Sequence, residues 1–315
     1  VSSPELLPWR AGRITTEQYL AGINRTAMRS YANTKKHTPE AEAIAIKDGL
    51  VQAVGSTQDI MREAGAATKK IDLAGRRVIP GLNDSHTHLI RGGLNFNLEL
   101  RWEGVPSVTD ALRLLKEQAV RTPPPQWVRV VGGWSEFQFA ERRMPTLEEI
   151  NQAAPDTPVF ILHLYGRALL NKAALNALGF DKSTPNPPGG VIEKDANGNP
   201  TGLLVAKPSA LILYSTLARG PKLPLDDQIN STRHYMREMN RLGVTSVIDA
   251  GGGGQNYPDD YSVIQKLHDD GQLTVRIAYN LFAQKAGAEL GDYERWINLT
   301  KPGAGSAMLR MNGGG

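Results

Sequence analysis

The 315-residue chain contains no cysteine, which excludes both disulfide bonds and thiolate metal ligands. Any metal site must therefore use histidine, carboxylate or modified lysine side chains. The sequence also lacks a run of about 18 apolar residues, so no segment is expected to cross a membrane. The formal net charge is only +4 and the charges are scattered, which argues against a nucleic-acid partner.

What is present is ordinary globular composition, 40% hydrophobic and 22% charged, with length for one large domain or two. The chain begins at Val1 rather than at methionine, and no secretory signal is visible. We expect a cytoplasmic protein. A periplasmic or secreted location stays open, because a signal segment could have been removed.

The stretch "VIPGLNDSHTHL", residues 78–89, ends an apolar run with two histidines one residue apart. If the run is a strand, Asp84, His86 and His88 share one face, because side chains alternate along a strand. Two imidazoles on one face are able to converge on one metal ion. The alternative is a pair of surface or core histidines, and the surrounding sequence must decide.

The part before this stretch, residues 1–77, favours small β structure. Hairpin signals occur in 41–55 and in 69–81, with a short helix between them. Residues 1–35 carry few strand signals and give no clear prediction. Short hairpins with little core of their own must pack on something else.

Residues 92–225 read as one inserted segment that follows a first strand in 78–91. Capping residues and helical spacing of apolar residues predict helices, and apolar runs predict strands. The predicted helices cover 106–120, 145–154 and 171–179, the strands cover 126–134 and 157–166, and 183–202 is predicted as loop.

From residue 226 a regular alternation of strand and helix begins. Helices are predicted over 226–243 and 258–271, and strands over 244–254, over 273–282 and from 307 onward. This alternation indicates a parallel sheet, either open or closed into a barrel.

Several segments together resemble one family. "PGLNDSHTHL" is similar to the P-G-x-x-D-x-H-x-H motif of the amidohydrolase superfamily, and "AEAIAIKDGLVQAVG" resembles the N-terminal strands of those enzymes. "TPNPPGG", "GNPTGLL" and "GVTSVIDAG" resemble the YtcJ-like branch, whose members are metal-dependent hydrolases of C–N bonds. The resemblance covers roughly residues 38–315. It implies a (β/α)8 TIM barrel with a small β-sandwich domain built from both chain ends, and a large insertion after strand 1.

The resemblance implies that His86 and His88 bind one or two divalent metal ions, with zinc expected. A metal-activated water would then attack a small amide-like, non-peptide substrate. Asp84 is a candidate catalytic residue that orients a histidine, and plain structural use is its alternative. The site should lie at the carboxyl ends of the strands, with the insertion 92–225 above it.

Lys207, in "TGLLVAKPSA", is a candidate for both catalysis and metal binding. A carboxylated lysine bridges two metals in some superfamily members, but Arg310 stands where that lysine usually lies. Arginine cannot be carboxylated. Either Lys207 substitutes or the site lacks a lysine bridge, and an exposed or salt-bridged lysine is the alternative.

Three further residues are candidates for substrate binding. Asp249 ends the second predicted barrel strand and either lines the cavity or caps a helix. Trp134 follows a strand and forms either a wall of the substrate cleft or part of a core. His163 is either a displaced substrate contact or a buried histidine whose hydrogen bonds are satisfied.

Length sets one further expectation. A complete barrel takes about 250 residues, and the parts outside 1–77 and 92–225 suffice for about four strands. We expect a fragment of an amidohydrolase that continues past Gly315 and is inactive alone. A half-enzyme completed by a second chain, and a barrel relic that acts as a binding or regulatory module, are the alternatives. Such an open half-barrel should self-associate as a homo-oligomer or be completed by the missing C-terminal half.

Overall fold

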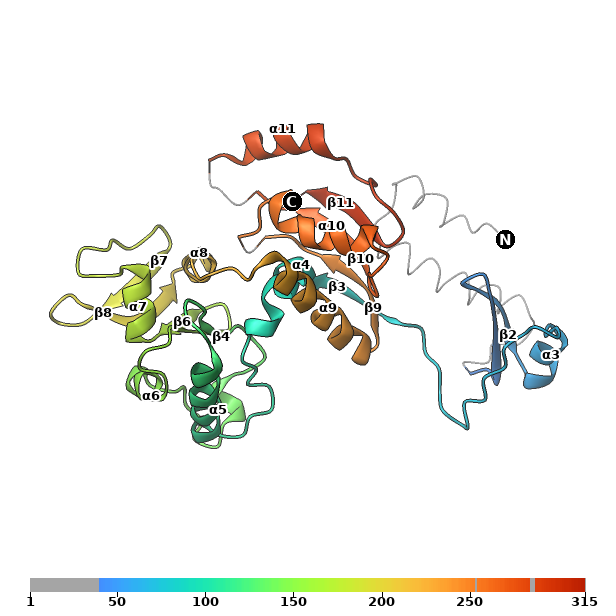
Figure 1. Ribbon diagram of the computed structural model, residues 1–315, viewed down its shortest axis with the longest axis horizontal. Helices are drawn as coiled ribbons and strands as arrows, with labels where there is room; N and C mark the ends of the chain where they lie inside the picture. The colour runs from blue at the N-terminus through green and yellow to red at the C-terminus, as the bar shows by residue number, and fades with distance from the viewer. Residues whose placement is uncertain (1–39, 253, 284–286, 315) are drawn as a thin grey trace.

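The computed structural model describes residues 40–252, 254–283 and 287–314. These residues form three separate β-sheets, two of which carry their own helices and hydrophobic cores (Figure 1). Residues 1–35, for which the sequence gives no clear prediction, lie outside the described part. Among the described helices, none combines the length and the apolar character that a bilayer crossing requires.

One sheet consists of four parallel strands in the order β11-β10-β9-β3. Their bounds are Leu82–Thr87 for β3, Val244–Asp249 for β9, Arg276–Leu281 for β10 and Leu309–Gly314 for β11. Strand neighbours in this sheet are consecutive once the insertion after β3 is set aside, as expected for successive β/α units. The predicted alternation after residue 226 is therefore confirmed, while the four described strands form an open sheet and no closed barrel.

Helices cover the sheet on the side where its core lies (Figure 1). The α4 and α9 helices pack against each other, and η3 leads directly into α10. The bounds are Leu89–Asn95 for α4, Leu225–Arg241 for α9, Asp259–Tyr261 for η3, Ser262–Asp269 for α10 and Glu289–Leu299 for α11. The core includes Leu89, Met236, Val247, Leu267 and Ile277.

The inserted segment forms a five-stranded sheet of order β4-β5-β6-β8-β7, in which only the β4–β5 pair is parallel. The strands are Val128–Val130 for β4, Val159–His163 for β5, Arg167–Leu170 for β6, Gly190–Lys194 for β7 and Pro200–Ala206 for β8. We call residues 96–224, which contain this sheet and its helices, the lobe. Two buried clusters share the sheet, and Ile161 and Phe160 on successive positions of β5 belong to different clusters. The sheet is therefore covered on both faces.

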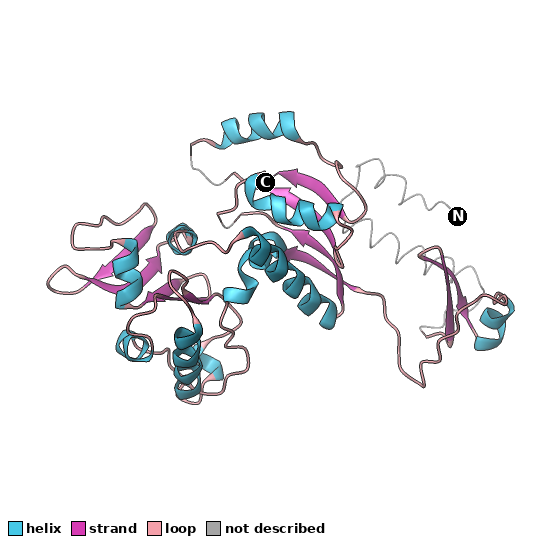
Figure 2. Ribbon diagram, viewed as in Figure 1, coloured by secondary structure: helices cyan, strands magenta, loops and turns pink. Residues whose placement is uncertain are grey.

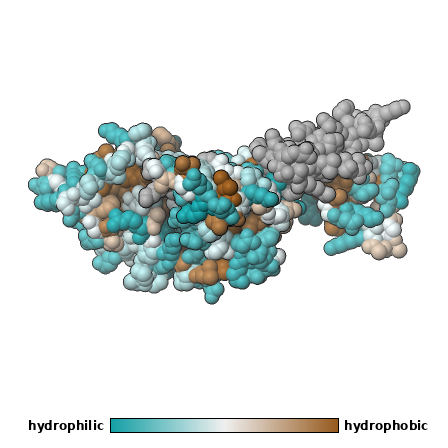
Figure 3. Space-filling view, turned by 90° about the horizontal axis from the view of Figure 1, so that it is seen from above, coloured by the Kyte–Doolittle hydropathy of each residue, from teal (hydrophilic) through white to brown (hydrophobic). Residues whose placement is uncertain are grey.

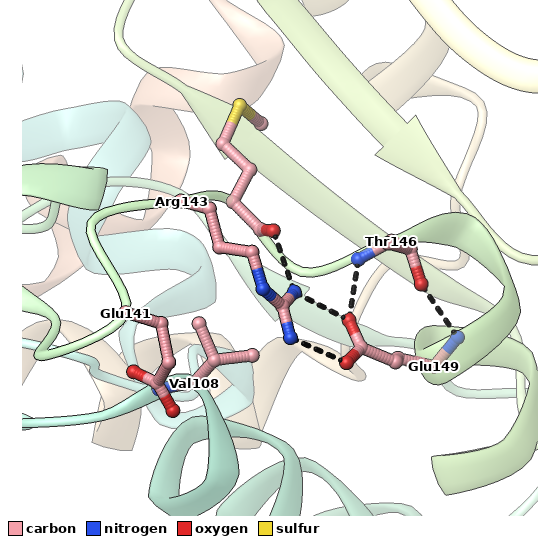
Figure 4. Close-up of polar contacts among 6 residues, drawn as sticks. Val108, Glu141, Arg143, Thr146 and Glu149 are labelled. Carbon is pink, nitrogen blue, oxygen red and sulfur yellow. Dashed lines mark hydrogen bonds and ion pairs between the residues drawn. The ribbon is translucent and has the colours of Figure 1, made fainter.

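Three lobe helices, α5, α6 and α7, begin at the caps that the sequence predicts. Ser107 accepts a hydrogen bond from the Asp110 backbone N–H at 3.0 Å, and Asn171 accepts one from Ala174 at 2.9 Å. Thr146 and Glu149 form a capping box, and Arg143 holds both Glu149 oxygens at 2.7 and 2.8 Å (Figure 4). The helices are Phe96–Leu98 for η1, Val108–Arg121 for α5, Glu136–Gln138 for η2, Leu147–Ala153 for α6, Lys172–Leu178 for α7 and Leu211–Ala218 for α8.

The N-terminal described part is a two-stranded ribbon, Ala43–Lys47 (β1) with Leu50–Gly55 (β2), followed by helix α3, Thr57–Arg62. A long segment without helix or strand joins it to β3 (Figure 2). The predicted hairpin in 69–81 is wrong: its turn forms, with Arg76 N–H donating to Leu73 at 3.0 Å, but its flanks do not pair. The flanking Ile71 and Ile79 are 70% and 69% exposed, so they lack the packing that a hairpin needs.

The surface is mostly hydrophilic and carries separate hydrophobic patches (Figure 3). Exposed apolar side chains occur on the β1–β2 ribbon, where Ile46 and Leu50 are 66% and 63% exposed. Among residues 40–77, the only sheet is the two-stranded β1–β2 ribbon, so the described residues do not show the predicted β-sandwich.

Candidate functional site

A cavity of about 450 Å³ lies between the carboxyl end of β3 and the lobe. His86, Thr87 and His88 contribute from β3 and its end, and Arg91 contributes from the first turn of α4. The lobe supplies the facing wall, including Glu99, Arg129, Tyr165 and Tyr214. The end of a parallel strand and the segment that leaves it thus build one site, as is usual for β/α folds.

His86 and His88 lie next to each other in this cavity, with ring centroids 5.5 Å apart and ring planes at 87°. Burial and the nearby charge of Arg91 lower the pKa of His88, which keeps its imidazole neutral at pH 7. Its Nδ1 is buried and makes no hydrogen bond with the described atoms. A neutral imidazole with an unpartnered nitrogen in a cavity has the chemistry of a metal ligand.

The local backbone differs from a simple alternating strand. The register of β3 against β9 shifts between Asp84 and Thr87, and the strand ends at Thr87. His88 is the N-cap residue of α4, with φ −123° and ψ 62°. Both histidines reach the same cavity because of this irregularity as much as because of strand alternation.

Asp84 does not take the place that the alternation predicts for it. It is absent from the cavity wall, and its Oδ1 accepts a hydrogen bond from the His86 backbone N–H at 2.9 Å. Its contact is with the His86 backbone rather than with a histidine ring, and a role in orienting a histidine stays a prediction. This contact is an Asx-type turn, which explains how an aspartate fits just before the strand irregularity.

Asp249 ends β9 and is fully buried beneath the site. One oxygen accepts from the Ile90 N–H at 2.8 Å and the other from the Gly251 N–H at 2.9 Å. Burial raises the pKa of its carboxyl against the opposing effect of these hydrogen bonds. The prediction of substrate contact is corrected: Asp249 ties the start of α4, and hence His88, to the end of the neighbouring strand.

Two glycines allow α4 to lie close to α9. A Cβ on Gly92 would stand 2.8 Å from the Tyr235 ring, and one on Gly93 would stand 2.9 Å from the Thr232 hydroxyl. Ser231 donates to the Gly93 carbonyl at 2.6 Å across the same contact. This close packing fixes the helix that carries the cavity residues.

The cavity wall is rich in charged groups that the sequence patterns do not reveal. Its cations are Arg91, Arg101, Arg129 and Lys222, and its acidic groups are Glu99, Glu103 and Asp260. Burial raises the pKa of Glu99 to about 7, although Arg101, Arg91 and Arg129 act in the opposite direction. These residues lie up to 174 positions from His86 in the chain, so only the fold brings them together.

Trp134 and His163 are placed in the lobe core rather than at the cavity. Trp134 is 5% exposed, its Nε1 donates to the Leu162 carbonyl at 3.0 Å, and it packs on Trp102 and Phe139. His163 lies on Trp134, and its Nε2 contacts a Glu136 oxygen at 2.7 Å. Both substrate-binding predictions are corrected, and the alternatives of a core tryptophan and a satisfied buried histidine describe the structure.

Lys207 is exposed after β8 and does not line the cavity that contains His86 and His88. Arg310 lies buried in β11, in register with Ala278. In the described ranges, no group of three or more histidine and acidic side chains is arranged to hold a metal. The structure therefore brings together His86 and His88 alone among the predicted metal ligands. Two imidazoles fit a divalent metal as a partial set, since catalytic zinc normally has three protein ligands.

Comparisons with known proteins agree with this arrangement. Residues 69–315 match the model of the amidohydrolase family. "Putative amidohydrolase YtcJ" of Bacillus subtilis is 38% identical over 55% of this chain and 32% of its own length. An N-substituted formamide deformylase of Arthrobacter pascens is 27% identical over 67% of this chain and 39% of its own length. A crystal structure of an uncharacterised metal-dependent hydrolase from Pyrococcus furiosus superposes with TM-score 0.55 at 22% identity, covering 86% of this chain and 51% of that one.

The structure is an α/β fold with two histidines at the carboxyl end of a parallel strand. The chain belongs to the amidohydrolase family, and within it resembles YtcJ. It spans about a third of the length of these curated relatives.

Proposed function

We propose that this chain contributes the first metal ligands and part of the substrate cavity of a hydrolase that cleaves C–N bonds in small, non-peptide amides. The observation that carries the proposal is the pair of neighbouring imidazoles, His86 and His88, in a cavity at the carboxyl end of a parallel strand. The formamide deformylase among its relatives supports N-substituted formamides as the first substrates to test.

His86 and His88 would hold a divalent ion, with zinc the first choice because two neutral imidazoles suit it. Such an ion lowers the pKa of a bound water and polarises a carbonyl oxygen. Asp84 holds the His86 backbone and Asp249 holds the start of α4, so both act as positioning residues. The proposal requires at least one further ligand from outside the four described strands or from a partner chain.

The test is hydrolysis of N-benzylformamide by the natural full-length protein, measured with and without chelator treatment. We expect His88→Ala to lower kcat/KM by at least about 100-fold, because loss of a catalytic metal removes several kcal/mol of transition-state stabilisation. His268→Ala, in α10 and outside the cavity wall, is the matched control and should retain the wild-type value. Ligand binding without hydrolysis of any amide would instead support a binding module.

A further inference from the structure

Arg91 occupies an unusual position in the cavity wall. It lies in the first turn of α4, three residues after the N-cap residue His88, and both residues line the cavity. Within the described ranges, no carboxylate lies within 4.0 Å of its guanidinium. A positive charge next to a proposed metal ion is unfavourable unless an anion balances it, so an anion bound near Arg91 would be stabilising.

The Tyr214 ring lies against this guanidinium, and Tyr165 lies against Tyr214. Arg91 lies over the Tyr214 ring at 4.8 Å from the centroid, and the Tyr165 ring lies 6.0 Å from that of Tyr214. Burial raises the pKa of Tyr214 to about 12, so its phenol stays neutral, and its hydroxyl shares hydrogen bonds with Tyr165 and Arg91. α4, α8 and the β5–β6 connection thus join a guanidinium and two phenols at one part of the cavity.

The other cations of the wall are engaged elsewhere. Lys222 pairs with Asp260 at 2.9 Å, Arg129 donates to the Pro221 carbonyl at 2.6 Å, and Arg101 stacks on Phe96 at 3.6 Å. Glu99 lies nearest to Arg101, at 3.9 Å, and its pKa of about 7 leaves it partly protonated at neutral pH. Glu103, also in the wall, is the remaining acidic group. The charge of Arg91 is therefore only partly compensated.

We propose that Arg91, with Tyr214 and Tyr165, binds a carboxylate carried by the substrate. This inference rests on the proposed function and narrows its substrate class to amides whose N-substituent bears an anionic group. A guanidinium matches a carboxylate with two parallel N–H donors, and the tyrosine ring holds that fork in place. The apolar wall, which includes Leu94, Leu100, Val131 and Leu217, suits a substrate that carries an apolar group beside its amide and its carboxylate.

The test compares two probes that differ by one group, N-formylphenylalanine and N-formyl-2-phenylethylamine. Their dissociation constants are measured by calorimetry on the full-length natural protein, both metal-loaded and after chelator treatment. We expect the carboxylate probe to bind about 10- to 100-fold more tightly, the effect of one charge-assisted hydrogen-bonded pair. The preference should persist in the stripped protein, which separates binding to Arg91 from carboxylate ligation of the metal.

Arg91→Gln should remove most of this preference, and Arg91→Lys should retain part of it, because lysine keeps the charge but not the planar fork. The matched control is Arg121→Gln, an exposed arginine in the last turn of α5, which should keep the full ratio. Thermal unfolding of each variant shows that a lost ratio does not reflect a lost fold. If Arg91→Gln does not fold, the proposal is tested by the ratio of the two dissociation constants in Arg91→Lys and in the wild type.

The outcomes separate this inference from the proposed function. Equal binding of both probes by the wild type, or a preference that disappears with the metal, overturns the carboxylate site. An unchanged ratio in folded Arg91→Gln does the same. Selective binding of the carboxylate probe without turnover would support the carboxylate site and contradict the proposed hydrolysis. Turnover of both formamides at equal kcat/KM would support hydrolysis and contradict the carboxylate site.

Discussion

The lobe core and the cavity wall treat their polar groups differently. In the lobe core, Asn171 bonds the backbone at four places, and Trp134 and His163 each have a partner, whereas Trp102 Nε1 is buried without one among the described residues. At the cavity beside the parallel sheet, His88 Nδ1 and Arg129 Nε are buried without one. Gln255, also in the cavity wall, has both side-chain polar atoms buried without a partner in the described part of the chain. Because an unpaired buried polar group is costly, these atoms of the wall are places where a ligand would supply the partner.

The largest effect should come from the lobe core. Trp134→Ala removes a large buried ring and its hydrogen bond, and we expect it to lower the free energy of unfolding of the lobe by about 3–5 kcal/mol. Phe137→Ala, nearby in sequence but 69% exposed, should change it by less than about 0.5 kcal/mol. Urea unfolding measures both. Similar values for the two variants would show that the lobe core is not centred on Trp134.

Asp249 tests the floor of the cavity. Asp249→Ala leaves the Ile90 and Gly251 N–H groups buried without an acceptor, which should destabilise this part by about 2–3 kcal/mol. Asp249→Asn keeps one acceptor and should lose less. Unlike Trp134→Ala, Asp249→Ala should also lower the metal content of the protein, because His88 is the N-cap residue of α4. Unchanged stability and metal content in Asp249→Ala would remove the positioning role.

The smallest effect concerns the capping network of α6. Hydrogen bonds from Arg143 and Thr146 lower the pKa of Glu149 to about 2, from a usual value of 4.5. The ionised carboxylate therefore stabilises the fold above about pH 4.5, and this contribution is lost as pH falls toward 2. Since the pair is partly exposed, Glu149→Gln should cost only about 0.5–1 kcal/mol at pH 7.

Glu148→Gln, in the same first turn but without the arginine, is the control for this network. Unfolding in urea at pH 7 and at pH 2.5 should show a difference between the two variants that shrinks at the lower pH. A difference that is constant with pH would rule out the ion pair as its cause.

Local signals were enough to predict α5, α6, α7, β4 and β5 of the lobe and the alternation after residue 226, but not β6, β7, β8 or α8. Caps such as Thr146 act within one turn, so their residues can be read directly from the sequence. The β7–β8 hairpin was missed although Asn197-Gly198 is a hairpin signal, because the surrounding turn residues favoured loop. Gly198 has φ +84°, as such a turn requires.

The site was predictable only in part, for a physical reason. The motif marks His86 and His88, but the shift in register of β3 depends on its pairing with β9, more than 150 residues later. Arg91, Glu99 and Tyr214 meet only after the lobe folds over the strand end, and no spacing in the sequence encodes that meeting. Trp134 and Lys207 were placed by position alone, and position does not say which way a side chain points.

The most direct test of this account is the metal content of the natural full-length protein. Elemental analysis should find at least one divalent ion per chain in the wild type. The His86→Ala/His88→Ala double variant should lose most of it, while His268→Ala should keep it. Full occupancy in the folded double variant, or a wild type that binds no divalent ion when zinc is supplied, would contradict the assignment of this cavity as a metal centre.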